Sequence, residues 1–150
     1  MTSLRMAAHL LVLPILATSL SSCGGDPIDG YCESLKGHQE ELTKTLGEGG
    51  TGGLIAALPV FEDLESNAPD DIKKDWTTLT GAVSGLSTAL EDAGVSADDF
   101  ENGEPPEGVS DAEAKKIADA TTKVSSTKTQ EASVRVQQHA RDVCHTSLTL

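Results

Sequence analysis

The hydrophobic residues of this chain recur at steps of three and four positions, which is the period of amphipathic helices. The clearest stripe lies in the middle of the chain and consists of Ile72, Trp76, Leu79, Val83, Leu86 and Leu90. It predicts a helix that begins at Asp70 and is closed by Gly94 in the C-cap role. No segment shows the alternation of apolar and polar residues that is expected of a half-buried strand.

Two helices are predicted before this one. The first begins at Asp26, a capping residue that is followed by proline, and ends in the glycine-rich stretch 47–53. The second is expected to start at the cap Thr51 and to continue through Leu64. Pro59 falls inside it and removes one backbone hydrogen bond, so we expect a kink there.

A long final helix is predicted to begin at Ser110, whose spacing to Glu113 forms a capping box. Its apolar stripe is narrow and made largely of small residues: Ile117, Ala120, Val124, Ala132, Val136, Ala140 and Val143. The stretch 125–128 is polar all round, and Thr127 with Gln130 repeats the capping pattern, so this helix should be kinked or broken near 125–128. The sequence therefore predicts an all-α fold, an up-down helical bundle of four main helices.

The first 22 residues have the pattern of an export signal. A charged start at residues 1–5 precedes an apolar run at 6–17, which is too short to span a hydrocarbon core of about 30 Å. Leu20, two serines and Cys23 follow, and this order resembles the bacterial lipobox, in which the cysteine receives diacylglycerol. An ordinary signal peptide with a stray cysteine is the alternative. We expect a signal peptide at 1–22, a lipidated Cys23 with a short tether at 23–27, and a helical domain at 28–150.

Cys32 and Cys144 remain once Cys23 is assigned to the lipid, and an even pair in an exported chain predicts a disulfide. The bridge would close a loop of about 110 residues, which the chain-entropy estimate values at about 4–5 kcal/mol. A metal site is the alternative, because His38, His139 and His145 lie near the two cysteines in sequence. Their spacings match no standard zinc pattern, so the disulfide is preferred.

The charge of the chain excludes several kinds of partner. Its formal net charge is −13, and it becomes −14 once residues 1–22, with Arg5, are removed. Such a polyanion repels nucleic acids and does not attach to anionic lipids through a basic face. Only 25 of the 128 residues after position 22 are Leu, Ile, Val or Phe, so the core must be small.

The motifs of known catalytic sites are missing from the sequence, and we predict no enzyme, cofactor or metal centre. His38-Gln-Glu-Glu41 is not the helical zinc-protease motif, and no serine lies in a nucleophile elbow. The stretch from Asp98 to Gly103 does not fit a calcium loop, because Phe100 stands where an oxygen ligand is needed. A divalent ion could still bind weakly through four carboxylates of this loop: Asp98, Asp99, Glu101 and Glu104. A solvated acidic loop is the preferred interpretation.

A second acidic cluster joins the second and third predicted helices: Glu62, Asp63, Glu65, Asp70, Asp71 and Asp75. The simplest explanation is a charged surface that keeps a tethered domain soluble. The serines and threonines at 125–129 could accept glycans, although a polar helix face has the same composition.

Four segments of the chain resemble a group of small helical lipoproteins of actinobacteria. They are residues 31–34 (Tyr-Cys-Glu-Ser), 58–64 (Leu-Pro-Val-Phe-Glu-Asp-Leu), 68–76 (Ala-Pro-Asp-Asp-Ile-Lys-Lys-Asp-Trp) and 139–144 (His-Ala-Arg-Asp-Val-Cys). The resemblance implies an exported helical domain in which Cys32 and Cys144 are paired. It implies no activity.

These observations lead to two functional hypotheses for a protein that is lipid-anchored on the outer face of the cytoplasmic membrane. The first is a non-enzymatic interaction module whose acidic surface meets a basic envelope protein or cations. The alternative is a carrier of a small hydrophobic or lipid ligand between the helices. The interior distinguishes them, because a carrier needs an apolar cavity of hundreds of Å³ and an interaction module should be filled.

Overall fold

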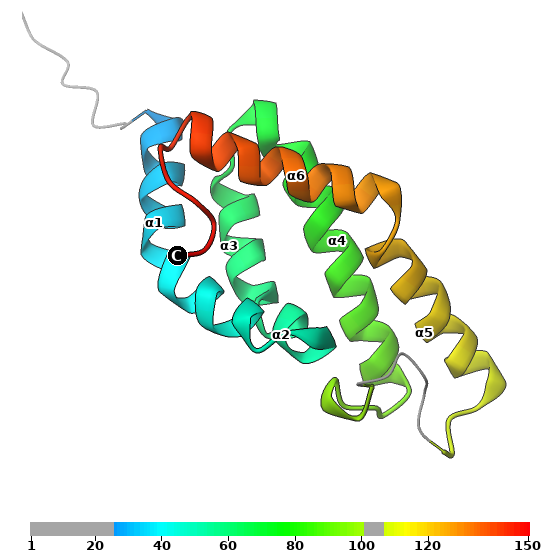
Figure 1. The fold of residues 1–150 in the computed structure, drawn as a ribbon. Helices are drawn as coiled ribbons and strands as arrows, with labels where there is room; N and C mark the ends of the chain where they lie inside the picture. The colour runs from blue at the N-terminus through cyan, green and yellow to red at the C-terminus, as the bar shows by residue number, and fades with distance from the viewer. Residues whose placement is uncertain (1–25, 101–106) are drawn as a thin grey trace, which may run out of the picture.

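The computed structural model describes residues 26–100 and 107–150, and Figure 1 shows the arrangement of their helices. The described part contains six α-helices and one short 3₁₀ helix, with no strand. They are α1 (Pro27–Gly47), α2 (Gly50–Ala56), α3 (Leu58–Asn67), α4 (Asp70–Asp92), η1 (Asp98–Phe100), α5 (Asp111–Val124) and α6 (Thr127–Asp142). The predicted all-α helical bundle is confirmed. The predicted count of four main helices is not matched exactly, because the segment predicted at 51–64 is two helices, while the last segment is divided near 125–128 as predicted.

Helix α1 begins where the capping pattern predicted. The Asp26 side chain accepts a hydrogen bond of 3.0 Å from the backbone N–H of Ile28, and Pro27 occupies the first turn. The buried residues of α1 are Tyr31, Cys32, Leu35 and Leu42, whereas Ile28 at the start of the helix is 38% exposed. The buried face of α1 packs against α2 and α3.

The single kinked helix expected over 51–64 is in fact two helices, α2 and α3. The chain turns at Ala57, and α3 begins directly after it, so that Pro59 lies in the first turn of α3. Backbone N–H groups of a first turn have no partner within the helix, so the missing N–H of the proline costs no helical hydrogen bond there. The cap of α2 is Gly49, with φ of +72°, rather than Thr51. At Gly53 the backbones of α1 and α2 come so close that a Cβ atom would lie 2.2 Å from the carbonyl oxygen of Thr45.

Helix α4 is the centre of the bundle and packs against α3, α5 and α6. All six residues of its predicted stripe are buried, with Trp76 and Val83 fully enclosed. Gly94 has φ of +65°, as its predicted C-cap role requires. Two clusters of buried residues result, a larger one around Trp76 and a smaller one around Leu90 and Ile117.

The long final helix is broken within the predicted stretch, between Val124 and Thr127. Ser126 caps α6 by accepting a hydrogen bond from the backbone N–H of Thr129, one residue before the predicted cap. The capping box of α5 at Ser110 and Glu113 is present as predicted. Helix α6 then packs its small buried residues against α4.

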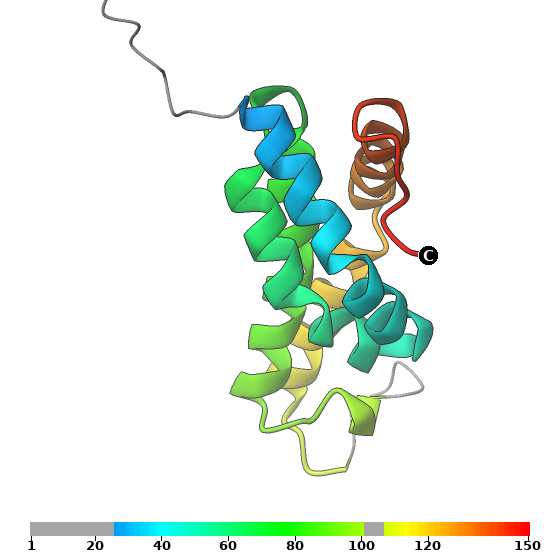
Figure 2. The same cartoon turned by 90° about the vertical axis from the view of Figure 1, so that its left-hand side faces the viewer.

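Cys32 and Cys144 form a disulfide with a Cα–Cα distance of 5.1 Å, which confirms the predicted bridge. Cys144 lies just beyond α6 rather than in its last turn, because that helix ends at Asp142. The bridge fixes α1 to the segment 143–150, which we call the return segment. Figures 1 and 2 show the return segment turning back beside α1. Gln39 donates a hydrogen bond of 2.8 Å to Oγ1 of Thr146, and the backbone N–H of Leu150 donates one of 2.7 Å to Oγ1 of Thr43.

Candidate functional site

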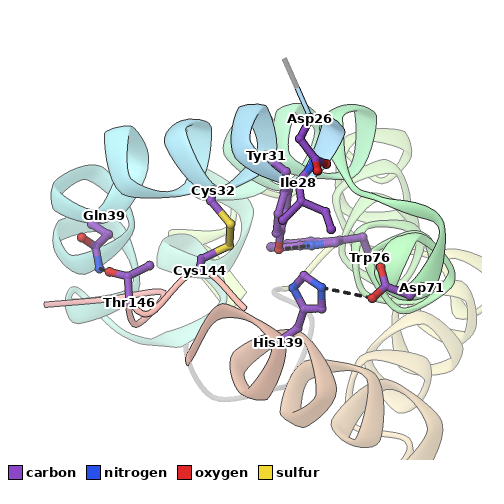
Figure 3. Close-up of a disulfide and its surroundings, with 10 residues drawn as sticks. All are labelled: Asp26, Ile28, Tyr31, Cys32, Gln39, Asp71, Trp76, His139, Cys144 and Thr146. Atoms are coloured by element: carbon purple, nitrogen blue, oxygen red, sulfur yellow. Dashed lines mark hydrogen bonds and ion pairs between the residues drawn. A yellow bond between two sulfur atoms is a disulfide. The ribbon is translucent and has the colours of Figure 1, made fainter. Parts of the chain in front are cut away.

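The disulfide end of the bundle holds an aromatic cluster (Figure 3). Trp76 donates a buried hydrogen bond of 2.9 Å from Nε1 to the Tyr31 hydroxyl. His139 packs against the Tyr31 ring in an edge arrangement, with 5.6 Å between ring centroids. Burial raises the pKa of Tyr31 above its ordinary value, the Trp76 bond partly opposes this, and the nearby Asp71 adds to it. Tyr31 is therefore a protonated structural contact rather than a reactive phenolate.

His139 is the most buried histidine of the described part, with its side chain 8% exposed. Its Nε2 lies 3.4 Å from the Asp71 carboxylate, within ion-pair reach, but the orientation does not form a hydrogen bond. Neither ring nitrogen has a hydrogen-bond partner among the described residues. The cluster offers no nucleophile beside this imidazole, so we assign it a packing role.

The alternative metal site is not assembled in the described part of the chain. Cys32 and Cys144 are used in the disulfide, and His38 is held by Asp63 at 3.2 Å instead. His145 adopts a positive φ of 52° in the return segment. No group of three or more His, Cys, Asp or Glu side chains in residues 26–100 and 107–150 is arranged to hold a metal ion.

Three carboxylates of the second acidic cluster face basic side chains of this chain. Asp75 accepts two hydrogen bonds from Arg135, at 2.7 and 2.9 Å, and Asp71 faces His139. The pKa of Asp63 is lowered, first by the Ser34 hydroxyl that donates to it and then by His38. Arg135 compensates the charge of Asp75 from within the chain, which leaves less of the cluster for an external cation.

The four carboxylates proposed for weak cation binding are only partly within the described residues. Asp98 and Asp99 lie in η1, whereas Glu101 and Glu104 lie outside the described ranges, as does the lipidation candidate Cys23. Asp99 accepts a hydrogen bond of 2.6 Å from the Ser96 hydroxyl. The two described carboxylates alone do not make an ion site.

An apolar groove lies between α6, the return segment and helices α1 to α4. Its first part has a volume of about 400 Å³. The apolar side chains that line this part are Leu42, Leu46, Leu54, Phe61, Leu79 and Leu148, and the polar residues are Ser133, Gln137, Arg141, Ser147 and Thr149. Figure 2 shows α6 standing apart from α1 on this side of the molecule.

A second hollow of about 340 Å³ adjoins the first. The two share Leu54, Leu79 and Ser133, so they form one elongated groove along α6. The second hollow is completed by Val83, Val124, Thr129, Gln130 and Val134. We refer to both parts together as the groove.

Two rows of residues on α6 explain why a groove forms here. Ala132, Val136 and Ala140 recur every fourth position, are buried, and place this helix against its neighbours. Ser133, Gln137 and Arg141 form the adjacent row with the same spacing and line the groove. Residues four apart share a helix face, so the second row stands beside the packed one. The sequence contained this polar row, but its position beside a hollow depends on the tertiary packing.

A larger hollow of about 720 Å³ lies at the glycine-rich turn 48–53, with Ala97 and Asp98 on its opposite side. Glycine backbone makes up much of its wall, so it offers few side chains for recognition. The groove is smaller, but its lining of leucines with a polar rim is typical of ligand sites. We therefore treat the groove as the candidate functional site.

No family model, curated protein or solved structure matches this chain. Among the helices of the described residues, none combines the length and the apolar character that crossing a membrane requires. The functional argument consequently depends on the chemistry of the groove and of the surface.

Proposed function

We propose that this chain is a lipid-anchored, extracytoplasmic, non-enzymatic binding protein that carries an apolar ligand in the groove. One observation carries the proposal, namely the two adjoining hollows lined by Leu42, Leu54, Leu79 and their neighbours. Its two parts each measure hundreds of Å³, and ligand sites occupy about 300–1,000 Å³. Apolar space of this size is the feature that distinguishes a carrier from an interaction module with a filled interior.

The anchor in this proposal is diacylglycerol on Cys23, as in the small helical lipoproteins of actinobacteria that the sequence resembles. Asp26, which caps α1, is three residues from Cys23, and three residues span at most about 10 Å. The disulfide end of the bundle would therefore stay close to the membrane. Replacing Cys23 with alanine should move the protein from the detergent phase to the aqueous phase on phase partitioning. Unchanged membrane retention would contradict the lipid anchor.

Binding in the groove is tested with a neutral hydrophobic dye, N-phenyl-1-naphthylamine. The exported, oxidised chain with Cys23→Ala should bind one dye per protein, with a rise in fluorescence. Ser133→Trp places a bulky ring where the two hollows meet, while every leucine of the lining stays in place. Gln138→Trp adds the same ring to the same helix at a position outside the groove. We expect loss of binding only in Ser133→Trp, and equal binding by both variants would contradict the carrier.

The acidic surface favours a second candidate function, the recognition of a basic envelope protein. The charge of −14 over 128 residues is far larger than solubility alone requires, since a magnitude of about 2–8 suffices for a small domain. Such an association should weaken steeply as salt rises past physiological strength, where the Debye length falls below about 8 Å. A partner that stays bound in high salt would indicate an apolar interface instead.

A further inference from the structure

The groove differs in charge from the rest of the molecule. The chain contains 24 acidic residues, yet within residues 26–100 and 107–150 no Asp or Glu lines either part of the groove. Among the residues that the structure describes, Arg141 is the only charged one in the lining. From these residues a ligand in the groove therefore meets a single positive charge and no carboxylate.

Arg141 also differs from the other arginine of the described residues. Arg135, six positions earlier on α6, is paired with Asp75 and Glu131. Arg141 forms no ion pair with any residue in the described ranges. Its guanidinium is thus available to an external anion, and a carboxylate is the group that it binds with two parallel hydrogen bonds.

The shape of the groove favours an extended ligand over a compact one. Gln130 lines one part and Arg141 the other. The eleven residues of helix from one to the other correspond to a length of about 16 Å along α6. Between them the apolar side chains Leu54 and Leu79 line both hollows. An extended hydrocarbon chain can follow such a path from the charged end to the apolar one.

We propose that the groove binds a long-chain carboxylate, with the carboxyl group at Arg141 and the hydrocarbon chain along the leucines towards Val83 and Val124. The proposal deepens the carrier function proposed above and rests on it. Gln137 and Thr149, which line the same hollow as Arg141, can donate hydrogen bonds to the carboxyl oxygens. Leu148 of the return segment lines the same hollow and would contact the part of the hydrocarbon chain next to the carboxyl group.

The proposal is tested by displacing N-phenyl-1-naphthylamine from the exported, oxidised chain with Cys23→Ala. The competitors are dodecanoate and dodecanol, each kept below the concentration at which it aggregates. Dodecanoate should bind at least about tenfold more tightly than dodecanol, since hydrogen bonds to a charged group contribute about that factor. Within the carboxylate series, affinity should rise about fourfold for each added methylene until the groove is filled, and then level off.

Arg141→Gln should abolish the preference for the carboxylate by lowering the affinity for dodecanoate to about that for dodecanol. Arg135→Gln is the matched control, because it removes the same charge from the same helix outside the groove, and it should keep the preference. Equal binding of dodecanoate and dodecanol by the unchanged protein, or an unaltered preference in Arg141→Gln, would overturn the long-chain carboxylate as ligand. If the dye still binds in the groove, that outcome does not contradict the proposed carrier function. Failure of the dye to bind would contradict the carrier function itself.

Discussion

Tyr31 and Trp76 are among the largest fully buried side chains of the described residues, and their polar atoms meet in the core. A buried indole N–H that loses its acceptor retains its desolvation penalty. The Tyr31 hydroxyl therefore stabilises the fold mainly by satisfying Trp76. This pair ties α1 to α4, two helices that both contribute side chains to the groove.

Tyr31→Phe should lower the free energy of unfolding by about 1–3 kcal/mol, because it leaves Nε1 of Trp76 buried without a partner. Urea denaturation at pH 7, followed by far-ultraviolet circular dichroism, measures this change in all variants, including those that lack the chain's single tryptophan. Trp76→Phe provides the second edge of a double-mutant cycle, and the double variant should show a coupling energy between the two sites. Additive losses would mean that the hydrogen bond contributes nothing.

Asp63 gives the surface a pH-dependent contribution to stability. Its pKa is lowered in the folded state by Ser34 and then by His38, so its contribution is present above the unfolded pKa. The contribution is lost as the pH falls through the folded pKa. Asp63→Asn should therefore reduce stability slightly at pH 7, and the difference from the unchanged protein should vanish in acid. Urea midpoints between pH 2 and 7 test this, and a difference that grows in acid would contradict it.

At the scale of the helices, the contact between α1 and α2 depends on a single glycine. A Cβ atom on Gly53 would lie 2.2 Å from the carbonyl oxygen of Thr45, so any side chain there must push the two backbones apart. Gly53→Ala should cost about 1–3 kcal/mol, as overpacking does. It should also weaken dye binding, because Leu54 on α2 lines the groove.

Gly47→Ala is the control for Gly53, since nothing lies within 4 Å of its added Cβ atom. This variant should have unchanged or slightly greater stability, because alanine favours helix. Thermal unfolding of both variants compares the two positions directly. A loss of equal size at both glycines would contradict the close α1–α2 contact as the cause of the effect at Gly53.

The elements that the sequence predicted are those with local signals. The caps at Asp26 and Ser110 and the stripe of α4 follow from residues that are close together in the chain, and the structure has them. Pro59 was assigned to a helix interior because apolar residues continue on both sides of it. No residue pattern in the sequence indicates the turn at Ala57, and it is this turn that places the proline in the first turn of α3.

The groove could not be predicted from periodicity. Leu79 belongs to the predicted stripe of α4 and is buried, but a stripe does not reveal whether a side chain meets a partner or a hollow. The hollow arises because α6 packs against α4 through Ala132, Val136 and Ala140, while the return segment lies over the space beside α1. These are distances between helices, which the spacing of residues within one helix does not fix.

At the scale of the whole molecule, the disulfide connects regions that are 112 residues apart in sequence. Loop closure of this length stabilises a domain by about 4–5 kcal/mol in the chain-entropy estimate, a large share for so small a core. Cys144→Ser, or reduction, should lower the free energy of unfolding by about 2–5 kcal/mol and increase protease sensitivity at 37 °C. Unchanged urea midpoints in oxidised and reduced protein would contradict this account.

The bridge also positions one wall of the groove. The return segment begins next to Cys144 and carries Leu148, which packs against the larger core cluster. Releasing Cys144 should loosen this segment even where α6 stays folded. Dye binding should therefore weaken in the reduced protein before its helical content is lost, as parallel fluorescence and circular dichroism can record.

The central claim is that the groove holds an apolar ligand in the protein's own environment. Native mass spectrometry of the protein purified from its own membrane tests it most directly, with Ser133→Trp and Gln138→Trp purified in the same way. We predict one non-covalent adduct of lipid-like mass on the unchanged protein and on Gln138→Trp, and none on Ser133→Trp. The absence of a non-covalent adduct from all three, or the same adduct on Ser133→Trp, would contradict the claim.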